Sequence, residues 1–165
     1  MRISGPTLTR WATVGLAFAL ALIAPWAAMG SEQALSTGQT LYVPVYSHIY
    51  SGDREQPVYL AVTVSVRNTD MQRSIAVTTV DYYNSEGKRI KRYLDKPVDL
   101  PPLATARFVV KESDKAGGSG ANFIVRWQSK TPTSPPLAES IMISTASQLG
   151  ISFTSRGVPV SEPTP

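Results

Sequence analysis

The segment at residues 58–67, VYLAVTVSVR, constrains the fold more than any other part of the chain. Every second position in it is apolar. These positions are Val58, Leu60, Val62, Val64 and Val66. A β-strand directs alternate side chains to opposite faces, whereas a helix would spread the five around its circumference. Since β-branched residues also favour extended backbone, the segment predicts a strand of an antiparallel sheet with one face in a core.

Comparable segments recur along the chain at spacings of about ten to fifteen residues, which is typical of a sandwich or barrel. They lie at residues 40–47, 74–83, 88–94, 97–100, 103–111, 121–129, 137–146 and 150–154. Residues 84–87, Asn-Ser-Glu-Gly, read as a turn whose glycine takes a positive φ. The sequence therefore predicts a single antiparallel β-sandwich, immunoglobulin-like, with about 7–8 strands over residues 40–157.

The N-terminus has the layout of a secretory signal. Arg2 and Arg10 precede an apolar stretch at residues 11–24, and Pro25 and small residues follow it. We expect a signal peptide at residues 1–30, with cleavage after Gly30. The alternative is a retained anchor, although the apolar stretch is shorter than the roughly 20 residues that a membrane helix needs. Export to the periplasm or the extracellular space is expected in either case.

The regions that flank the sandwich show no core-forming pattern. Residues 31–39 are predicted to be a linker, and residues 158–165, with three prolines, a disordered tail. Removal of Arg2 and Arg10 from the 16 basic residues leaves 14 against 12 acidic ones, a net charge of +2. That balance gives no reason to expect a nucleic-acid partner. The chain has no cysteine, so it contains no disulfide or thiolate chemistry.

Five blocks of sequence, in order along the chain, resemble a bacterial exported family known as domain of unknown function 3124 (DUF3124). The blocks are YVPVYSHIY at 42–50, VRNTD at 66–70, YLDKPV at 93–98, GGSGANFIV at 117–125 and GISFTSRG at 150–157. The resemblance covers nearly all of residues 39–157 and implies an exported protein without an assigned activity. A looser likeness to immunoglobulin-like envelope domains concerns the fold alone.

A catalytic interpretation would depend on His48, the only histidine. It follows Ser47 and lies near Asp53, which suggests a small envelope hydrolase. However, neighbours on a strand face opposite ways, and residues 117–121 lack the last glycine of a G-x-S-x-G nucleophile turn. The alternative is a structural or surface histidine. We expect no catalytic constellation, no cofactor and no metal site, because the acidic residues form no ligand pattern.

Three features suggest binding. Tyr42, Tyr46 and His48 share one face of the first predicted strand, opposite Leu41, Val43 and Val45, and either face could be the core. The basic segment 88–92 either protects an edge strand or contacts anionic polymers or lipid head groups. The loop at 117–120 either binds an anion through its N–H groups or is a flexible connection. The candidate binding residues are Tyr42, Tyr46, His48, Lys91, Arg92, Ser119, Asn122 and Arg156.

These features favour a non-catalytic binding or accessory module of the bacterial cell envelope, with a sheet face or a loop end as its working surface. Two alternatives stay open: a carbohydrate- or polyanion-binding module, and a hydrolase that uses His48. The expected partner is an envelope protein or a glycan, not a nucleic acid. No stable membrane span is expected after signal cleavage, and the oligomeric state is left open.

Overall fold

The structure, a computed structural model, describes residues 34–145 and 150–161. The regular elements in these ranges are all β-strands, so the predicted all-β fold is confirmed. The expected signal peptide and the last four residues of the expected tail lie outside the described residues. Within the described ranges, no helix is long and apolar enough to cross a membrane.

The described residues form twelve strands, all paired antiparallel. They are β1 (Ser36–Pro44), β2 (His48–Ser51), β3 (Gln56–Tyr59), β4 (Ala61–Arg67), β5 (Ile75–Tyr83), β6 (Arg89–Arg92), β7 (Val98–Leu100), β8 (Thr105–Val110), β9 (Asn122–Thr133), β10 (Leu137–Ser144), β11 (Ile151–Arg156) and β12 (Val158–Ser161).

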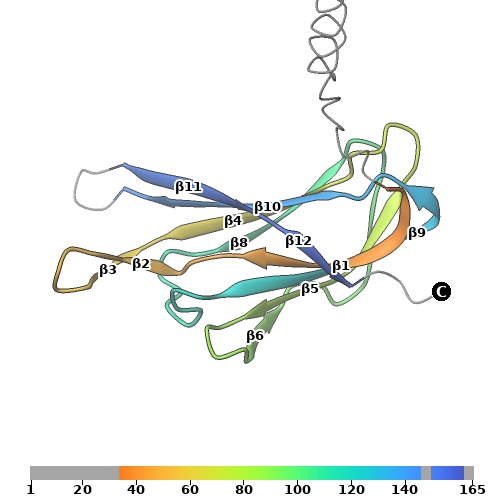
Figure 1. Cartoon of the computed structure of the whole chain (residues 1–165). Coiled ribbons are helices and arrows are strands. Elements are labelled where there is room, and N and C mark those ends of the chain that lie inside the picture. The colour runs from red at the N-terminus through yellow and green to blue at the C-terminus, as the bar shows by residue number, and fades with distance from the viewer. Residues whose placement is uncertain (1–33, 146–149, 162–165) are drawn as a thin grey trace, which may run out of the picture. The chain divides into compact units, whose positions relative to one another are not determined.

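Two sheets form the layers of a sandwich (Figure 1). The six-stranded sheet has the order β12-β1-β9-β5-β6, with β7 also paired to β5. The four-stranded sheet has the order β11-β10-β4-β8. The immunoglobulin-like comparison holds only at this level of a two-sheet sandwich.

The core lies between the inner faces of the two sheets. The strand with the clearest alternation contributes Val62, Val64 and Val66 at 0–1% exposure, as its period of two predicts. From the opposite sheet, β9 contributes Phe123 and Val125, both at 0%. Burial of such side chains supplies most of the stabilisation available to a domain without disulfides, about 1.5–3 kcal/mol each.

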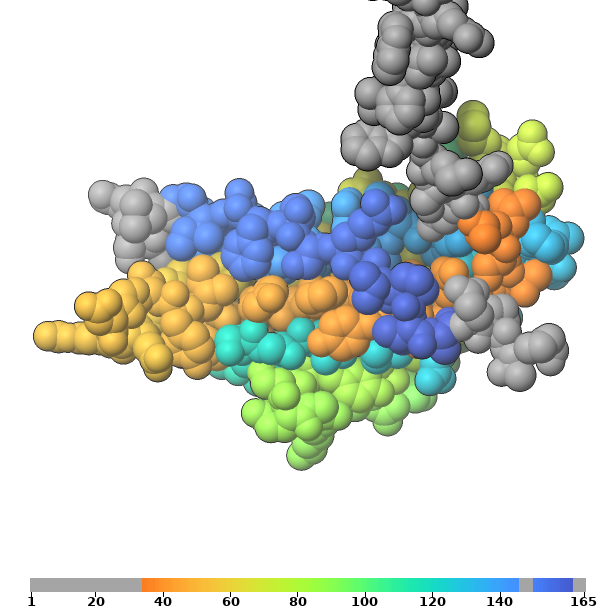
Figure 2. Space-filling model, viewed as in Figure 1, coloured from red at the N-terminus to blue at the C-terminus, as the bar shows by residue number. Residues whose placement is uncertain are grey.

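The structure has more strands than the predicted 7–8. Part of the excess comes from a separate two-stranded hairpin of β2 and β3, which forms the tip at one end of the domain (Figures 1 and 2). The predicted strand 58–67 is interrupted at Leu60, where the chain passes from this hairpin into β4. The Leu60 N–H donates to the Ser47 carbonyl at 3.0 Å, which holds the junction in place.

The ends of the domain also differ from the prediction. The first strand begins at Ser36, inside the expected linker, and β12 occupies residues 158–161 of the expected tail. Both segments take part in strand pairing, since residues 36–39 of β1 pair with β9 and β12 forms a ladder with residues 40–42 of β1. Local composition does not reveal this pairing, because each strand obtains its hydrogen-bond partners from a distant part of the chain.

Two further expectations are confirmed in detail. Gly87, in the turn between β5 and β6, has a φ of +75°. The inner face of β1 includes Leu41 and Val43, and Val45 follows directly after the strand; all three are at 0–4% exposure. Tyr42 therefore points away from the core, onto the outer face of the six-stranded sheet.

Candidate functional site

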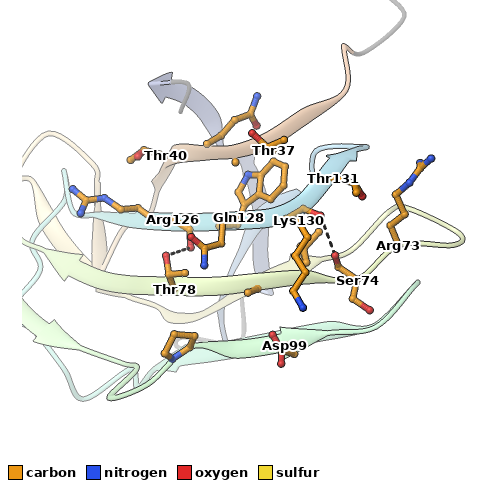
Figure 3. A pocket seen from close by; sticks show the side chains of 17 residues that line it. Thr37, Thr40, Arg73, Ser74, Thr78, Asp99, Arg126, Gln128, Lys130 and Thr131 are labelled. Atoms are coloured by element: carbon orange, nitrogen blue, oxygen red, sulfur yellow. Dashed lines mark hydrogen bonds between the residues drawn. The ribbon is translucent and has the colours of Figure 1, made fainter. Parts of the chain in front are cut away.

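A groove of about 950 Å³ lies on the outer face of the six-stranded sheet, and we call it the β9 groove (Figure 3). Its lining comes from β1, β9, β5 and β7, together with the loop before β5. Figure 3 shows Arg126, Gln128 and Lys130 in sequence along β9, at the centre of the view. The groove therefore follows one long strand in the interior of the sheet.

Small residues form the floor of the β9 groove. In the strand register, Gln128 of β9 lies between Gly38 of β1 and Ala76 of β5, and Ala76 is in turn opposite Asp99 of β7. A Cβ at Gly38 would lie 2.7 Å from the Trp127 carbonyl oxygen, closer than carbon and oxygen allow. Glycine is required there, and the hollow beside Gln128 follows from the lack of side-chain volume on both of its neighbours.

Threonine hydroxyls line the next row of the groove. Thr40 of β1 is opposite Arg126, and across β9 the pairing with β5 shifts between Val77 and Thr79. At this irregularity Thr78 donates its hydroxyl to the Arg126 carbonyl at 3.2 Å (Figure 3). The bulge thus directs an extra polar side chain toward the groove.

The charge of the lining is positive. Arg73, Arg126 and Lys130 line the groove, whereas Asp99 is its only carboxylate among the described residues. Arg73 is bound to Asp70 at 3.4 Å. Arg126 and Lys130 are exposed and form no ion pair with any described residue. These two cations are therefore available to an anion from solution.

A network of hydrogen bonds to the Asp70 carboxylate, which we call the Asp70 knot, supports one end of the groove. The Asp70 carboxylate accepts hydrogen bonds from the Thr133 hydroxyl and from the N–H groups of Gln72 and Arg73. The bond from Thr133, followed by those two backbone bonds, holds the pKa of this carboxyl far below its usual range. Because β9 ends at Thr133, the knot fixes the Arg73 loop to the strand that carries the groove.

Trp127 lines the groove but is only 3% exposed, since it faces the core with Phe123 and Val125. Its indole Nε1–H is buried and has no hydrogen-bond partner among the described residues. The groove therefore offers hydroxyl, amide and cationic groups, without an exposed aromatic surface on which a flat ring could stack.

The structure places some of the sequence-predicted residues on the face that carries the groove. One row of paired residues runs across four strands of the sheet. It consists of Tyr42 on β1, Ile124 on β9, Asp81 on β5 and Arg92 on β6. This row lies one outward-facing position beyond Arg126 on β9. Asn122 belongs to the same face, at the first position of β9. Tyr42, Arg92 and Asn122 therefore share one surface with the β9 groove, without lining it.

The other predicted residues lie elsewhere. Tyr46 packs edge-on against Phe153 of β11, with ring centroids 5.7 Å apart. Lys91 lies over the Tyr93 ring at 4.3 Å. Arg156 ends β11 in the four-stranded sheet, opposite Glu139. These positions do not form one site.

The basic segment 88–92 is an edge strand, as one of its two interpretations predicts. Alternation predicts that Arg89 and Arg92 face opposite ways, yet both reach Asp81, at 3.2 and 3.4 Å. The reason is a register shift between Tyr82 and Tyr83, which changes the facing of β6 along its length. Asp81 neutralises part of this cluster, so its free charge is smaller than the sequence suggests.

The glycine loop that contains Ser119 is held by specific contacts. The Gly117 carbonyl accepts from the backbone N–H and the hydroxyl of Ser85, and the Gly118 carbonyl accepts from the Ser47 N–H. The Gly120 N–H donates to the Ser85 hydroxyl at 3.0 Å. These bonds fasten the loop to the sandwich, and at Gly120 they occupy an N–H that an anion site would need.

His48 is part of an aromatic cluster on the β2–β3 hairpin. Its Nε2 lies 3.2 Å from the Tyr50 hydroxyl, and its ring packs edge-on against Tyr50 and Tyr59. The neighbouring Ser47 hydroxyl is buried and hydrogen-bonded to the Tyr82 hydroxyl at 2.8 Å. Ser47 and His48 thus bind different partners. Within the described ranges, no three potential metal ligands are grouped together.

The residues that line the β9 groove were not singled out from the sequence, although one signal was available. Residues 123–130 alternate apolar Phe123, Val125 and Trp127 with polar Arg126, Gln128 and Lys130. This pattern indicates that one strand presents three hydrogen-bonding side chains to solvent. The flanking Gly38 and Ala76 become neighbours of Gln128 only through the strand register.

The geometry defines the class of protein: an all-β sandwich with a polar, positively charged groove on one outer face. The chain belongs to the family described as "Protein of unknown function (DUF3124)", whose model matches residues 38–160. The match includes the whole of β9 and all the groove residues on β5 and β7.

Further comparisons add little. No curated protein matches the chain. A solved structure described as "Crystal Structure of Thermotoga maritima 1070" is similar to it with a TM-score of 0.43 and 8% identity, covering 73% of this chain and 92% of that chain. A likeness at this level carries no argument about function.

Proposed function

We propose that this protein is a non-catalytic binding module of the bacterial cell envelope and that its ligand occupies the β9 groove. The observation that carries the proposal is the groove itself: a hollow of about 950 Å³ whose floor is kept open by Gly38 and Ala76. Concave sites with a few convergent polar groups are the usual binding sites of proteins.

The contacts of the potential catalytic groups support binding rather than catalysis. His48 interacts with Tyr50 on the β2–β3 hairpin, while Ser47 is committed to Tyr82 in the interior. A nucleophile needs a base within hydrogen-bond reach, and here each group has another partner. The envelope location rests on the signal-like sequence at residues 1–30.

The experiment compares two alanines that occupy equivalent positions on the two outer faces. Ala76 lies on the groove floor in β5, and Ala61 lies on the outer face of the four-stranded sheet in β4. Both are half-buried within strands. We expect Ala76→Phe to fill the groove and weaken ligand binding at least tenfold, whereas Ala61→Phe leaves binding within twofold.

Binding is measured by NMR titration of the purified protein with a panel of soluble envelope glycan fragments and peptides. The expected shift changes gather at Thr40, Arg126 and Gln128. The proposal fails if the changes gather on the β2–β3 hairpin or at the glycine loop instead, or if Ala61→Phe abolishes binding and Ala76→Phe does not. Thermal unfolding of both variants separates loss of binding from loss of folding.

A further inference from the structure

We propose that the ligand of the β9 groove is an acidic glycan that lies along β9, with anionic groups at Arg126 and Lys130 and hydroxyl groups at the residues between them. This inference rests on the proposed function and specifies the chemistry of the same site.

The two unpaired cations define the direction of the ligand. Arg126 and Lys130 are four residues apart on β9 and both line the groove, so along the strand they are separated by at most about 13 Å. A ligand that contacts both must therefore be extended and must carry anionic groups at a comparable separation. A guanidinium binds a carboxylate through two parallel hydrogen bonds, and an ammonium binds it as a point charge.

The groups between the cations suit sugar hydroxyls. Gln128 offers an amide oxygen and an amide nitrogen, while Thr40 and Thr78 offer hydroxyls that donate and accept. Gly38 and Ala76, on either side of Gln128, leave room for a ring of some thickness above the sheet. Uncharged donors and acceptors between two sparse cations match a polymer of hydroxyl-rich rings in which only some units are charged.

The position of the groove disfavours a peptide ligand. Peptides that bind to sheets usually add a strand at an exposed edge, where backbone groups are free. The groove lies over β9, whose backbone is paired with β1 on one side and β5 on the other. Recognition at this position therefore depends on side chains, which favours a ligand rich in hydroxyl and carboxyl groups.

The groove also disfavours single-stranded nucleic acid. Such ligands need aromatic side chains for base stacking and a dense row of cations for the backbone. Here Trp127 is buried, and Asp99 lies in the groove beside the cations. Closely spaced phosphates would meet that carboxylate, whereas sparse carboxylates can avoid it.

The test measures binding of the purified protein to hyaluronan oligosaccharides, to their methyl-esterified form and to polyphosphate by isothermal titration calorimetry. In hyaluronan only every second ring carries a carboxylate, so the three probes separate a sparsely charged glycan from a neutral glycan with the same backbone and from a polyanion without sugar rings. We expect the hyaluronan oligosaccharides to bind, and the ester and polyphosphate to bind at least tenfold more weakly. Added salt should weaken the interaction severalfold by screening the charges.

The matched variants remove equal charge inside and outside the groove. Arg126→Gln with Lys130→Gln should weaken binding of the hyaluronan oligosaccharides at least tenfold. Lys88→Gln with Lys111→Gln, at exposed positions outside the groove, should change it less than twofold. Equal losses in both double variants would show non-specific attraction and overturn the inference, as would tighter binding of polyphosphate than of the hyaluronan oligosaccharides.

A different outcome would overturn the acidic glycan but keep the groove as a binding site. In that outcome a neutral glycan or a peptide binds, Ala76→Phe abolishes its binding, and the double groove variant has no effect. If none of the three probes binds and no ligand produces shift changes in the groove, the inference and the proposed function both fail.

Discussion

The two sheets present different outer faces, although the inner faces of both contribute to the core. The six-stranded sheet exposes the β9 groove with Arg126, Gln128 and Lys130. The four-stranded sheet exposes Val109, Ile141 and Ile143, at 47%, 36% and 47%. Since both inner faces serve the core, only the outer faces distinguish the sheets. The comparison supports placing the proposed binding site on the six-stranded sheet, and exposed apolar side chains such as those on the other sheet are common on protein surfaces.

Buried polar contacts occur on both sheets. Tyr82 of β5 bonds with Ser47 in the interior, and Ser140 of β10 donates its hydroxyl to the Pro44 carbonyl at 2.7 Å. The ion pairs differ: Asp81 of β5 binds two arginines, whereas among the described residues the four-stranded sheet has one ion pair between its strands, Arg67 to Glu139 at 3.0 Å. We expect stability to be most sensitive to changes that displace the contact between Tyr82 and Ser47, because both side chains are fully buried.

The largest expected effect compares two glycines, one near each sheet. A Cβ at Gly117 would lie within 2.5 Å or less of the Tyr82 and Ser47 hydroxyls, both of which are buried, so Gly117→Ala must displace a core contact. We expect a loss of about 3 kcal/mol in the free energy of unfolding, measured by urea denaturation. Gly150→Ala, next to β11, has no atom of the described residues within 4 Å of its added Cβ and should change stability by less than about 0.5 kcal/mol. Equal effects would show that the two sheets do not differ in this respect.

The second prediction concerns Asp70, whose knot joins the loop after β4 of one sheet to the end of β9 in the other. Its folded-state pKa is depressed, so its stabilising contribution is complete above the unfolded value of about 3.9 and is lost as the pH falls toward the folded value. Asp70→Asn should lower the urea midpoint at pH 7 and flatten its decline between pH 5 and pH 3.

The control for the loss of stability at low pH is Asp99→Asn, which removes an exposed carboxylate in β7. This variant should keep the wild-type pH dependence. If the urea midpoint of Asp70→Asn declined between pH 5 and pH 3 as steeply as that of the wild type, the hydrogen bonds of Asp70 would not be the cause of the loss of stability in acid.

The smallest expected effects come from the ion pairs. Arg67 is 45% exposed and Arg92 56% exposed, so solvent screens both of their pairs. Arg67→Gln and Arg92→Gln should each cost less than about 1 kcal/mol in thermal or urea unfolding. Arg92→Gln should cost the less of the two, because Arg89 still contacts Asp81 at 3.2 Å. A loss of several kcal/mol in either variant would show that these surface pairs contribute more than exposure allows.

Local patterns allowed part of the fold to be predicted from the sequence. The alternation in residues 58–67 predicted a buried valine face, and the buried Val62, Val64 and Val66 confirm it. The glycine of the 84–87 turn and the edge position of β6 were also predicted correctly. Each of these depends on neighbours in the chain, where side-chain direction follows directly from the spacing.

The candidate site was predicted only in part. Tyr42 and Arg92 were proposed from the sequence and lie on the face that carries the groove, whereas His48 and Arg156 belong to other regions. The groove residues Arg126 and Lys130 were missed, because their alternation with the core residues of β9 was read only as evidence for a strand.

The sequence by itself determined that the chain forms paired strands, because the period of two fixes which side chains share a face. Only the tertiary structure decided where the hollow lies. Gly38, Ala76 and Gln128 are separated by dozens of residues, and the register of β1, β9 and β5 brings them side by side. That register depends on hydrogen bonds and core packing across the whole sheet, which no local segment specifies.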